Sequence, residues 1–341
     1  MRMNGLTRRD FLVASGSVLV GSALSGFKSL EDKLILGNGN HRYSCHHDWL
    51  TPPPGMLFGD THGVAQDRHG NIYLAHTVHP DSKSDDTICV YNSRGKFLRS
   101  FGSQFKGGAH GLDLRREGGE EFLYHCDVNR RKFTKTKLDG TVLFELGAPE
   151  ASGKYKGGEA FNPTNVAFAP DGDFFLADGY GSSWIHRYGA DGEYKSTFGG
   201  YGSEKGQVNC PHGLWLDDRG KEPLLAVADR GNRRIQYFDL DGKHVRFHTE
   251  GMRMPCHFSI REGEMLVPDL EGVITILDED NKPIVQLGDG HPSSLRGRPR
   301  SEFINGKFIH PHDAMFLNNG DILVAEWVPV GRVTLLRRER N

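Results

Sequence analysis

Several features that define other classes of protein are scarce or missing in this sequence. The 341 residues hold only five cysteines, an odd number without a C-x-x-C pair, so neither a disulfide framework nor a zinc–thiolate site is expected. Acidic and basic residues nearly balance at 44 against 42, and a net charge of −2 supplies no field for binding nucleic acid or an acidic membrane. Walker, nucleophile-elbow, H-E-x-x-H and Rossmann motifs are absent as well. The common nucleotide-binding and hydrolase classes are therefore not indicated.

Long hydrophobic runs are also missing, apart from one near the N-terminus. Residues 7–12 read Thr-Arg-Arg-Asp-Phe-Leu and precede an apolar run, softened by Gly and Ser, that ends near Gly26. Paired arginines before a weak hydrophobic region are typical of a twin-arginine export signal, and the small residues Ala23 and Ser25 fit cleavage after Ser25. The run is shorter than the ~20 apolar residues that span a bilayer. We expect residues 1–25 to be a signal peptide, with the mature protein periplasmic or secreted and left without a stable membrane anchor.

Glycine, by contrast, is abundant at 44 residues, and a pattern of short apolar runs and Gly-containing turns recurs about every 50 residues. Each repeat opens with a polar residue, usually His, and its second run ends in an acid. Turn signals every 8–12 residues without helical periodicity indicate an all-β fold, and about 50 residues is the size of a four-stranded propeller blade. The second strands are expected at residues 72–75, 122–125, 174–177, 225–228, 265–267 and 322–325.

Six such repeats predict a six-bladed β-propeller over residues 59–341. The last repeat supplies only three clear strands, and a candidate fourth lies upstream of the first repeat, around residues 42–49. Pairing these two parts of the chain would close the ring and hide the strand edges. Residues 26–58 are therefore interpreted as a leader that carries the ring-closing strand. An open solenoid of the same repeats is the alternative.

The residue that opens each repeat is expected to line the central axis, because the innermost strand of every blade starts there. Alternate blades of a six-fold ring lie about 120° apart, so His110, His212 and His312 would present three imidazoles to one cation and leave one side open, as catalytic zinc sites do. A hydrogen-bonded residue at a strand start is the ordinary alternative for any single histidine. The shared position favours a metal site. By repeat, the predicted ring reads His62, His110, Asn165, His212, His257 and His312.

The loops that follow the second strands should overhang this ring. Most of their acids are expected to be structural, capping turns and tying blades together. Tyr180 and Arg230 differ from these acids, because a phenol and a guanidinium beside a divalent cation suit proton transfer and the stabilisation of negative charge. Both are candidate catalytic residues.

Four motifs carry a family resemblance. They are Asp178-Gly179-Tyr180, Cys210-Pro211-His212-Gly213-Leu214, the run Ala-Asp-Arg-Gly-Asn-Arg-Arg-Ile-Gln at residues 228–236, and Pro311-His312-Asp313. Together they resemble peptidyl-α-hydroxyglycine α-amidating lyase, a six-bladed propeller of the NHL type, over about residues 60–336. The resemblance implies zinc on His110, His212 and His312, Tyr180 as the base and Arg230 as an active-site arginine. The implied reaction splits the C–N bond of a carbinolamide, in a small-molecule or peptide substrate, into an amide and glyoxylate.

The same resemblance implies a structural calcium ion. Its ligands would be the carboxylate of Asp313 and the backbone carbonyls of Val64 and Leu112. Hard oxygen ligands of this kind suit calcium.

Departures from the family pattern fall around the channel. Where the family has an arginine that meets the substrate carboxylate, this chain has Thr77, after His76. His310 stands where the family has methionine, and His62 and His257 are further polar additions. A channel of this polarity suggests an altered substrate.

Two other functions stay open. A calcium-dependent sugar lactonase would use carboxylates, which Asp127, Asp178, Asp229 and Asp269 could supply. A non-catalytic NHL-type binding propeller would use the ring histidines for hydrogen bonding only. The oligomeric state is not set by the sequence.

Two further features receive ordinary interpretations. Cys210 and Cys256 precede ring histidines, and buried small side chains are favoured there over thiolate ligands. Residues 296–300 read Arg-Gly-Arg-Pro-Arg, for which a solvated loop is the default interpretation over a binding patch.

Overall fold

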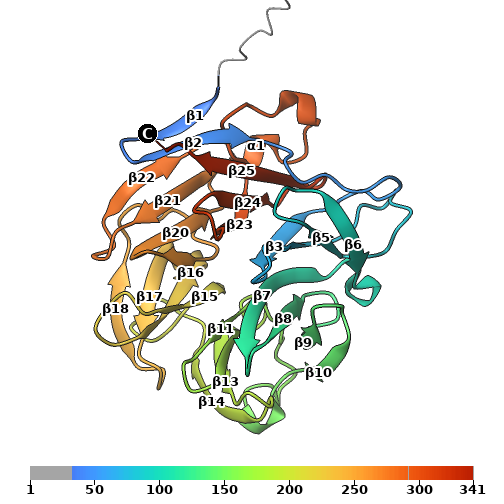
Figure 1. Cartoon of the computed structure of the whole chain (residues 1–341). Coiled ribbons are helices and arrows are strands. Elements are labelled where there is room, and N and C mark those ends of the chain that lie inside the picture. The colour runs from blue at the N-terminus through green and yellow to red at the C-terminus, as the bar shows by residue number, and fades with distance from the viewer. Residues whose placement is uncertain (1–32, 291, 341) are drawn as a thin grey trace, which may run out of the picture. The chain divides into compact units, whose positions relative to one another are not determined.

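Six antiparallel sheets surround a central axis in the computed structural model, which describes residues 33–290 and 292–340 (Figure 1). The predicted all-β, six-bladed propeller is therefore confirmed. The signal peptide predicted at residues 1–25 lies outside the described residues.

Each of the first five blades is a sheet of four consecutive strands, and its first strand lies innermost. The strands of blades one to three are β3 (Thr61–Gln66), β4 (Ile72–His76), β5 (Ile88–Tyr91), β6 (Phe97–Phe101), β7 (Ala109–Glu117), β8 (Glu120–Asp127), β9 (Lys132–Lys137), β10 (Val142–Leu146), β11 (Asn165–Phe168), β12 (Phe174–Ala177), β13 (Trp184–Tyr188) and β14 (Tyr194–Gly199). Those of blades four and five are β15 (Pro211–Asp217), β16 (Leu224–Asp229), β17 (Arg234–Phe238), β18 (His244–His248), β19 (Ser259–Arg261), β20 (Glu264–Asp269), β21 (Val273–Leu277) and β22 (Pro283–Leu287).

Helical structure is confined to single turns within the described residues. The short helix α1 (Pro292–Leu295) lies between blades five and six. Turns of 3-10 helix occur at Ser103–Phe105, Glu150–Ser152, Arg230–Asn232 and Arg300–Glu302.

Blade six joins the two ends of the propeller. Its inner strands are β23 (Pro311–Phe316), β24 (Ile322–Glu326) and β25 (Arg332–Arg338), and β2 (His41–His46) pairs with β25 through Cys45 opposite Leu336. The predicted ring-closing strand is thus confirmed, although it begins and ends earlier than expected. The added strand β1 (Ile35–Asn38), which the sequence pattern did not indicate, folds back on β2 as a hairpin.

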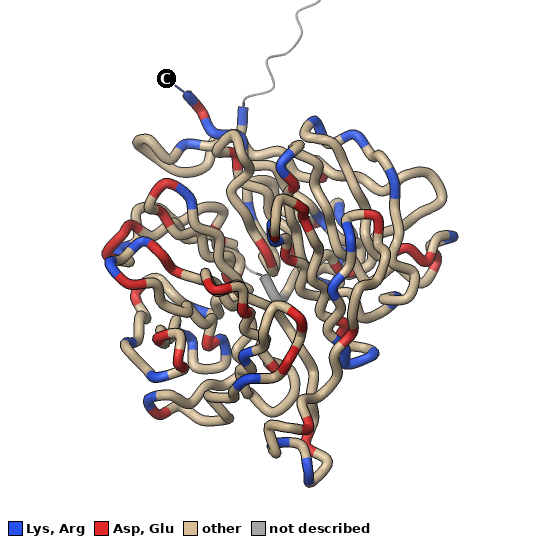
Figure 2. The backbone as a smooth tube through the Cα atoms, turned by 60° about the horizontal axis from the view of Figure 1, so that its bottom comes forward, with Lys and Arg blue, Asp and Glu red and all other residues tan. Residues whose placement is uncertain are grey.

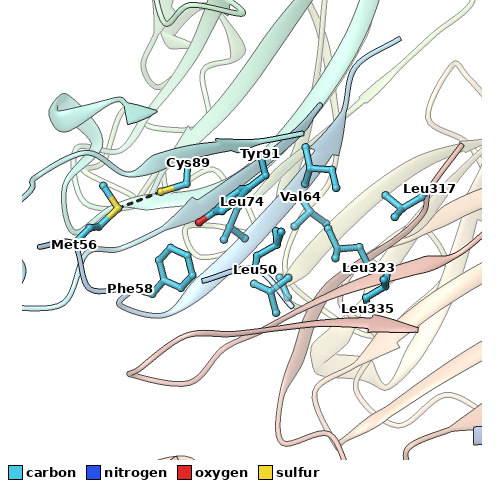
Figure 3. Close-up of a cluster of buried hydrophobic side chains, with 13 residues drawn as sticks. Leu50, Met56, Phe58, Val64, Leu74, Cys89, Tyr91, Leu317, Leu323 and Leu335 are labelled. Carbon is cyan, nitrogen blue, oxygen red and sulfur yellow. Dashed lines mark hydrogen bonds between the residues drawn. The ribbon is translucent and has the colours of Figure 1, made fainter. Parts of the chain in front are cut away.

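Apolar packing fills each of the six interfaces between neighbouring blades, since every buried cluster draws side chains from two adjacent sheets. The cluster between blades six and one shows this at the closure, where Leu50 and Phe58 of the leader pack with Leu74 and Leu335 (Figure 3). Alternating strand faces bury one apolar side against each neighbour, which explains why the strands read as nearly continuous apolar runs.

In blades three to six, the acid at the end of the second strand fixes the loop that leads to the axis. Asp229 Oδ1 accepts a hydrogen bond from the backbone N–H of Asn209 at 2.7 Å, and Glu326 Oε1 accepts one from the N–H of Ile309 at 2.7 Å. Asp178 and Asp269 make the same contact with Asn162 and Met254. These carboxylates hold backbone in place and do not converge on a common ion, as expected of structural caps.

Charged residues of both signs are scattered along the chain (Figure 2). Across residues 33–290 and 292–340, no helix is both long and apolar enough to cross a membrane.

Candidate metal centre

The inner strands place two successive residues of each blade at the axis. In five blades the first axial position is the residue that directly follows the partner of the last residue of the second strand, as His110 follows Ala109, which pairs with Asp127. In blade three β12 ends one residue earlier, and Thr164 holds this position because its N–H bonds the carbonyl of Ala177, as that of Cys256 bonds Pro268. By this register the first axial positions are His62, His110, Thr164, His212, Cys256 and His312, and the second axial positions are Gly63, Gly111, Asn165, Gly213, His257 and Asp313.

This register corrects part of the predicted ring. Asn165 and His257 were expected at the same position as the other four residues, but each lies one residue later. Thr164 and Cys256 make the equivalent backbone bonds, to the carbonyls of Ala177 and Pro268 at 2.9 Å each. Because a shift of one residue turns a strand side chain to the other side, Asn165 and His257 belong to a separate layer.

A β-bulge accompanies each histidine at the first axial position. The ladder between first and second strands shifts register between Thr61 and Val64 in blade one and at the matching places in blades two, four and six. An extra residue at such a place redirects its side chain. The four imidazoles are thereby aimed into one cluster.

Glycine at the second axial position lets neighbouring blades approach closely. A Cβ on Gly111 would lie 2.3 Å from the carbonyl oxygen of Thr164, and one on Gly213 would lie 2.3 Å from that of Cys256. These same carbonyls accept hydrogen bonds from Nδ1–H of His110 and His212, at 2.9 Å each. The glycines therefore permit the contacts that fix both imidazoles, and they leave Nε2 as the nitrogen that can accept a hydrogen bond or a metal ion.

The predicted trio of imidazoles comes together. Ring centroids lie 4.9 Å apart for His110 and His212, 4.6 Å for His110 and His312, and 4.6 Å for His212 and His312. All three side chains are buried. A cavity of about 10 Å³ between them, which is the size of a water molecule or an ion, is also lined by His257 and Asp313.

His62 is a fourth member of the cluster. Its Nδ1 lies 3.3 Å from Nε2 of His312, and its ring centroid is 4.8 Å from that of His110. Among the described residues, the nitrogens of His62, His110 and His312 all lie within 4.8 Å of one another, so the candidate ligand set defined by nitrogen separations includes His62 in place of the predicted His212. The structure thus offers four imidazoles where three were predicted.

The cluster is electrically neutral. Burial lowers the pKa of His110 to about 3, and burial followed by neighbouring imidazoles or Arg230 lowers the pKa of His62, His212 and His312 well below the ordinary value. Neutral imidazole is the form that binds metal. Converging neutral nitrogens of fixed orientation fit a divalent cation, and zinc in particular accepts such a set.

Tyr180 reaches the same point from the loop after β12. Its hydroxyl lies 3.2 Å from Nε2 of His110 and 3.0 Å from Nε2 of His212, although its ring is 39% exposed. Burial of the hydroxyl raises the pKa of Tyr180 to about 12, and the charge of Arg230 opposes this shift.

Arg230 approaches from the loop after β16 and lies 5.2 Å from the centroid of the Tyr180 ring. Its Nη2 donates to Sγ of Cys210 at 3.1 Å and its Nη1 to Sγ of Cys256 at 3.9 Å. Burial alone would lower the pKa of Arg230, but Tyr180 and the two thiols raise it. Burial also raises the pKa of Cys256 to about 12, so this thiol stays protonated and contacts Arg230 rather than acting as a thiolate ligand.

The second axial layer has a different chemistry. His257 Nδ1 donates to Oδ1 of Asp313 at 2.5 Å, and its Nε2 lies 3.7 Å from Oδ1 of Asp113. Asn165 joins the layer by donating from Nδ2 to Oδ2 of Asp113 at 2.7 Å. Burial alone would lower the pKa of His257, but Asp313 and then Asp113 raise it to about 9, so the ring is an imidazolium at neutral pH. Asp113 was missed by the sequence reasoning, although an acid three residues after His110 in an apolar strand was the available signal.

These residues do not fit the calcium ion that the resemblance implies. Asp313 Oδ2 accepts the backbone N–H of Val64 at 2.8 Å and Oδ1 accepts His257, so both carboxylate oxygens already have donors. Calcium takes six to eight oxygen ligands. Here the cation beside the Asp313 carboxylate is the imidazolium of His257, which is hydrogen-bonded to it. Leu112 is buried as well.

The remaining predicted channel residues lie farther out. His76 is buried inside blade one against Phe58 and Cys89, with its ring 4.9 Å from that of Phe58. His310 is half-buried; its Nδ1 bonds the carbonyl of Leu270 at 2.7 Å. Thr77 Oγ1 accepts the backbone N–H of Asp60 at 3.0 Å.

The fold and the repeats define a six-bladed β-propeller. Its homologues are named peptidyl-α-hydroxyglycine α-amidating lyase: lyase 1 of Drosophila melanogaster is 28% identical over 345 residues, which cover 87% of this chain and 60% of the relative. The resemblance that the motifs indicated is thereby confirmed. The chain thus spans 60% of the length of this relative. No protein-family model matches the chain.

Solved structures show the same fold at lower identity. A streptogramin B lyase superposes with a TM-score of 0.58 at 13% identity, covering 88% of this chain and 100% of that one. A gluconolactonase of Xanthomonas campestris gives 0.58 at 13%, covering 89% and 95%.

Proposed function

We propose that this chain is an exported, metal-dependent lyase that cleaves the C–N bond of a carbinolamide, as the names of its homologues suggest. The observation that carries the proposal is the convergence of His110, His212 and His312 with the hydroxyl of Tyr180. Zinc is the proposed ion, because it accepts three neutral imidazoles and keeps a position open for substrate. The protein is expected to act on a small molecule or peptide after export by the twin-arginine route.

The chain's own residues divide the work. Zinc, when bound, supplies a Lewis acid that polarises the substrate hydroxyl and lowers its pKa. Tyr180, a protonated phenol at its raised pKa, gives its proton to the departing amide nitrogen as the C–N bond breaks and takes the hydroxyl proton in its place, which releases an amide and an aldehyde. Arg230, held over the Tyr180 ring, stabilises negative charge on the phenol oxygen or the substrate.

Metal content and product release test the proposal together. Protein purified without chelator should contain about one zinc per chain and release glyoxylate and benzamide from α-hydroxyhippurate. Removal of the metal should abolish release and added zinc should restore it. Metal-free protein, or zinc-loaded protein inert toward this substrate, would count against the proposal.

Tyr180→Phe separates proton transfer from metal binding. The variant should keep its zinc, because the imidazoles are unchanged, while kcat falls roughly 10²- to 10⁴-fold, the usual contribution of a general acid–base. Tyr201→Phe, on an exposed residue of blade three, is the matched control and should behave as wild type. Full activity in Tyr180→Phe would remove this residue from the mechanism.

The lactonase alternative has the gluconolactonase likeness in its favour, which concerns the fold. Two of the carboxylates that it would need already bind backbone, since Asp178 and Asp229 accept N–H groups from the loops that lead to β11 and β15. The candidate metal cluster is built from imidazoles instead.

A further inference from the structure

A second cavity lies farther along the inner strands that carry the metal centre. Leu114 comes four residues after His110 on β7, and Trp215 comes three residues after His212 on β15. At about 3.3 Å per residue, these side chains lie roughly 10 Å from the imidazoles, beyond the second axial layer. We call this space the distal cavity; the residues that define it include Asp113, Leu114, Phe168, Trp215, Asp218 and Ile260.

The distal cavity has the size of a ligand site. Its volume is about 320 Å³, within the range of pockets that hold small organic molecules. The inner strands of blades two to five form its walls, with Asp218 following the end of β15. Its lining is mostly apolar and contains two acids, which is the composition expected of a pocket that orients a ligand by a few polar groups.

The floor of the distal cavity carries a donor and an acceptor that lack hydrogen bonds. Nε2 of His257 is buried and makes none, and Oδ1 of Asp113 lies 3.7 Å from it, which is too far for a hydrogen bond. Asp113 lines the cavity, as does Trp215, whose ring lies 5.7 Å from that of His257. Because Nδ1 of His257 donates to Asp313, the Nε2 side of the ring is the one that faces this floor.

A hydroxyl group would complete both contacts at the floor. It would accept from Nε2–H of His257 and donate to Oδ1 of Asp113, at about 2.8 Å from each. Oδ2 of Asp113 already accepts Nδ2 of Asn165, so Oδ1 is the oxygen left for a ligand. An ammonium is less suited to this point, because the imidazolium of His257 would repel it.

The rim of the distal cavity has the opposite preference. Asp218 is exposed, and its carboxylate has no partner among the described residues. No described lysine or arginine lines the cavity. Arg115 lies over the ring of Phe168, but it donates to backbone carbonyls of blade three, and Arg261 donates to one in blade six. The charge at the rim therefore favours a cation.

We propose that the distal cavity binds a small amine that also carries a hydroxyl group and an apolar body. The hydroxyl lies between His257 and Asp113, the apolar body packs on Trp215, and the ammonium lies at Asp218. The second axial layer separates this site from the candidate metal centre. The inference is therefore independent of the proposed function.

Three related probes test the site in the full-length protein. They are 2-amino-1-phenylethanol, 2-phenylethylamine, which lacks the hydroxyl, and 1-phenylethane-1,2-diol, which lacks the charge. Wild type should bind the amino alcohol about tenfold more tightly than either of the others in calorimetric titrations, because each of them leaves a polar group of the site unpaired. Equal binding of all three, or no binding, would overturn the inference.

Metal removal distinguishes the distal cavity from the imidazole cluster, since an amine is also a ligand for zinc. The affinity for the amino alcohol should be the same in zinc-loaded and chelator-treated protein. Binding that is lost with the metal would place the amine at the imidazoles and would reject the distal site.

Asp218→Asn tests the rim without disturbing the fold, because the carboxylate is exposed and has no internal contact. It should bind the amino alcohol about tenfold more weakly and the diol as wild type does. Asp241→Asn is the matched control, since its side chain is 94% exposed, and it should bind all three probes as wild type does. Unchanged binding of the amino alcohol by Asp218→Asn would contradict the placement of the ammonium.

Asp113→Leu tests the floor by removing the acceptor with little change of shape. Its melting temperature is measured first, and a folded variant should bind the amino alcohol no better than 2-phenylethylamine. If it keeps the preference for the hydroxyl, the inference is wrong. Should this variant fail to fold, the results with Asp218→Asn and the three probes still decide the question.

Discussion

The two axial layers of this propeller hold histidines in different protonation states, although the two axial positions are adjacent in the sequence of each blade. At the first axial position, His62, His110, His212 and His312 are buried together without a carboxylate and stay neutral. At the second, His257 is equally buried but lies between Asp313 and Asp113 and is protonated. Burial alone therefore does not decide the state of a histidine; its partners do.

Small and large residues alternate unequally among the six second axial positions, and the large ones fill the space that the small ones leave. Glycine at the second axial position of blades one, two and four leaves room at the axis, which Asn165, His257 and Asp313 of the other blades fill. Asn165 and Asp313 then accept the N–H groups of Leu214 and Val64 in the next blade, at 2.7 and 2.8 Å. The second layer thus ties the blades together beneath a first layer left free for chemistry.

Removing an imidazole from the first layer should have the largest effect. In His212→Ala we expect the zinc content to fall from about one per chain to near zero and glyoxylate release to be lost, because three protein ligands are the minimum for such a site. His62→Ala should keep its metal with affinity weakened roughly 10- to 100-fold, as for a residue that supports a ligand. Metal analysis of both variants checks this. Loss of metal in His62→Ala with retention in His212→Ala would assign the ion to His62, His110 and His312 instead.

Breaking the ion pair of the second layer should cost stability rather than chemistry. In His257→Gln two buried acids lose their cation, which typically destabilises by about 3–5 kcal/mol. Denaturant unfolding of the metal-loaded protein measures the change, with His69→Gln on the exposed surface as the control expected near zero. A loss below about 1 kcal/mol, the range of exposed pairs, would show that the contact with Asp313 contributes little.

Much of the fold followed from periodicity. The expected second strand at residues 174–177 matches β12, and the others differ only at their ends, because turn residues and apolar runs are local signals. The hairpin strand β1 was missed because its short run, Ile-Leu-Gly-Asn, carries little pattern of its own.

The axial site was partly predictable. His110, His212 and His312 were found by their shared phase, but Asn165 and His257 were placed one residue early. A signal for the correct register was present, because a proline directly precedes the first axial position in four blades. These prolines are Pro163, Pro211, Pro255 and Pro311. Outside this site, the orientation of Arg296 could not be foreseen, because it depends on contacts with Asp60 and Trp327 from distant parts of the chain.

The two layers should also oppose each other in the pH dependence of stability. A histidine whose pKa is lower in the folded than in the unfolded protein reduces the free energy of unfolding as pH falls below its unfolded pKa of about 6.5. The first layer therefore destabilises the fold in acid. His257 has a folded pKa of about 9, so its contribution to the free energy of unfolding is lost as pH rises from about 6.5 to 9, at up to roughly 1.4 kcal/mol per pH unit. Asp113 and Asp313 are the acids that face it, and burial raises the pKa of Asp113 to about 7, so Asp113 also releases a proton at the lower end of this window.

Unfolding of wild type and His257→Gln at several pH values isolates the alkaline effect. The difference in unfolding free energy between the two proteins should shrink steadily from pH 6.5 to 9, since only wild type releases this proton late. A difference that stays constant over the window would show that His257 is not protonated in the folded state.

The smallest expected effect concerns calcium, and it distinguishes the two layers most directly. If the imidazolium of His257 supplies the positive charge at Asp313, a calcium chelator or added calcium should leave the melting temperature of wild type unchanged, because both carboxylate oxygens are engaged. His257→Ala vacates that place between Asp313 and Asp113 and should make the melting temperature rise with added calcium, since two carboxylates then face each other without a cation. A wild type that melts several degrees lower in chelator would restore the calcium site that the family resemblance implies, and would place His257 beside the ion rather than in its stead.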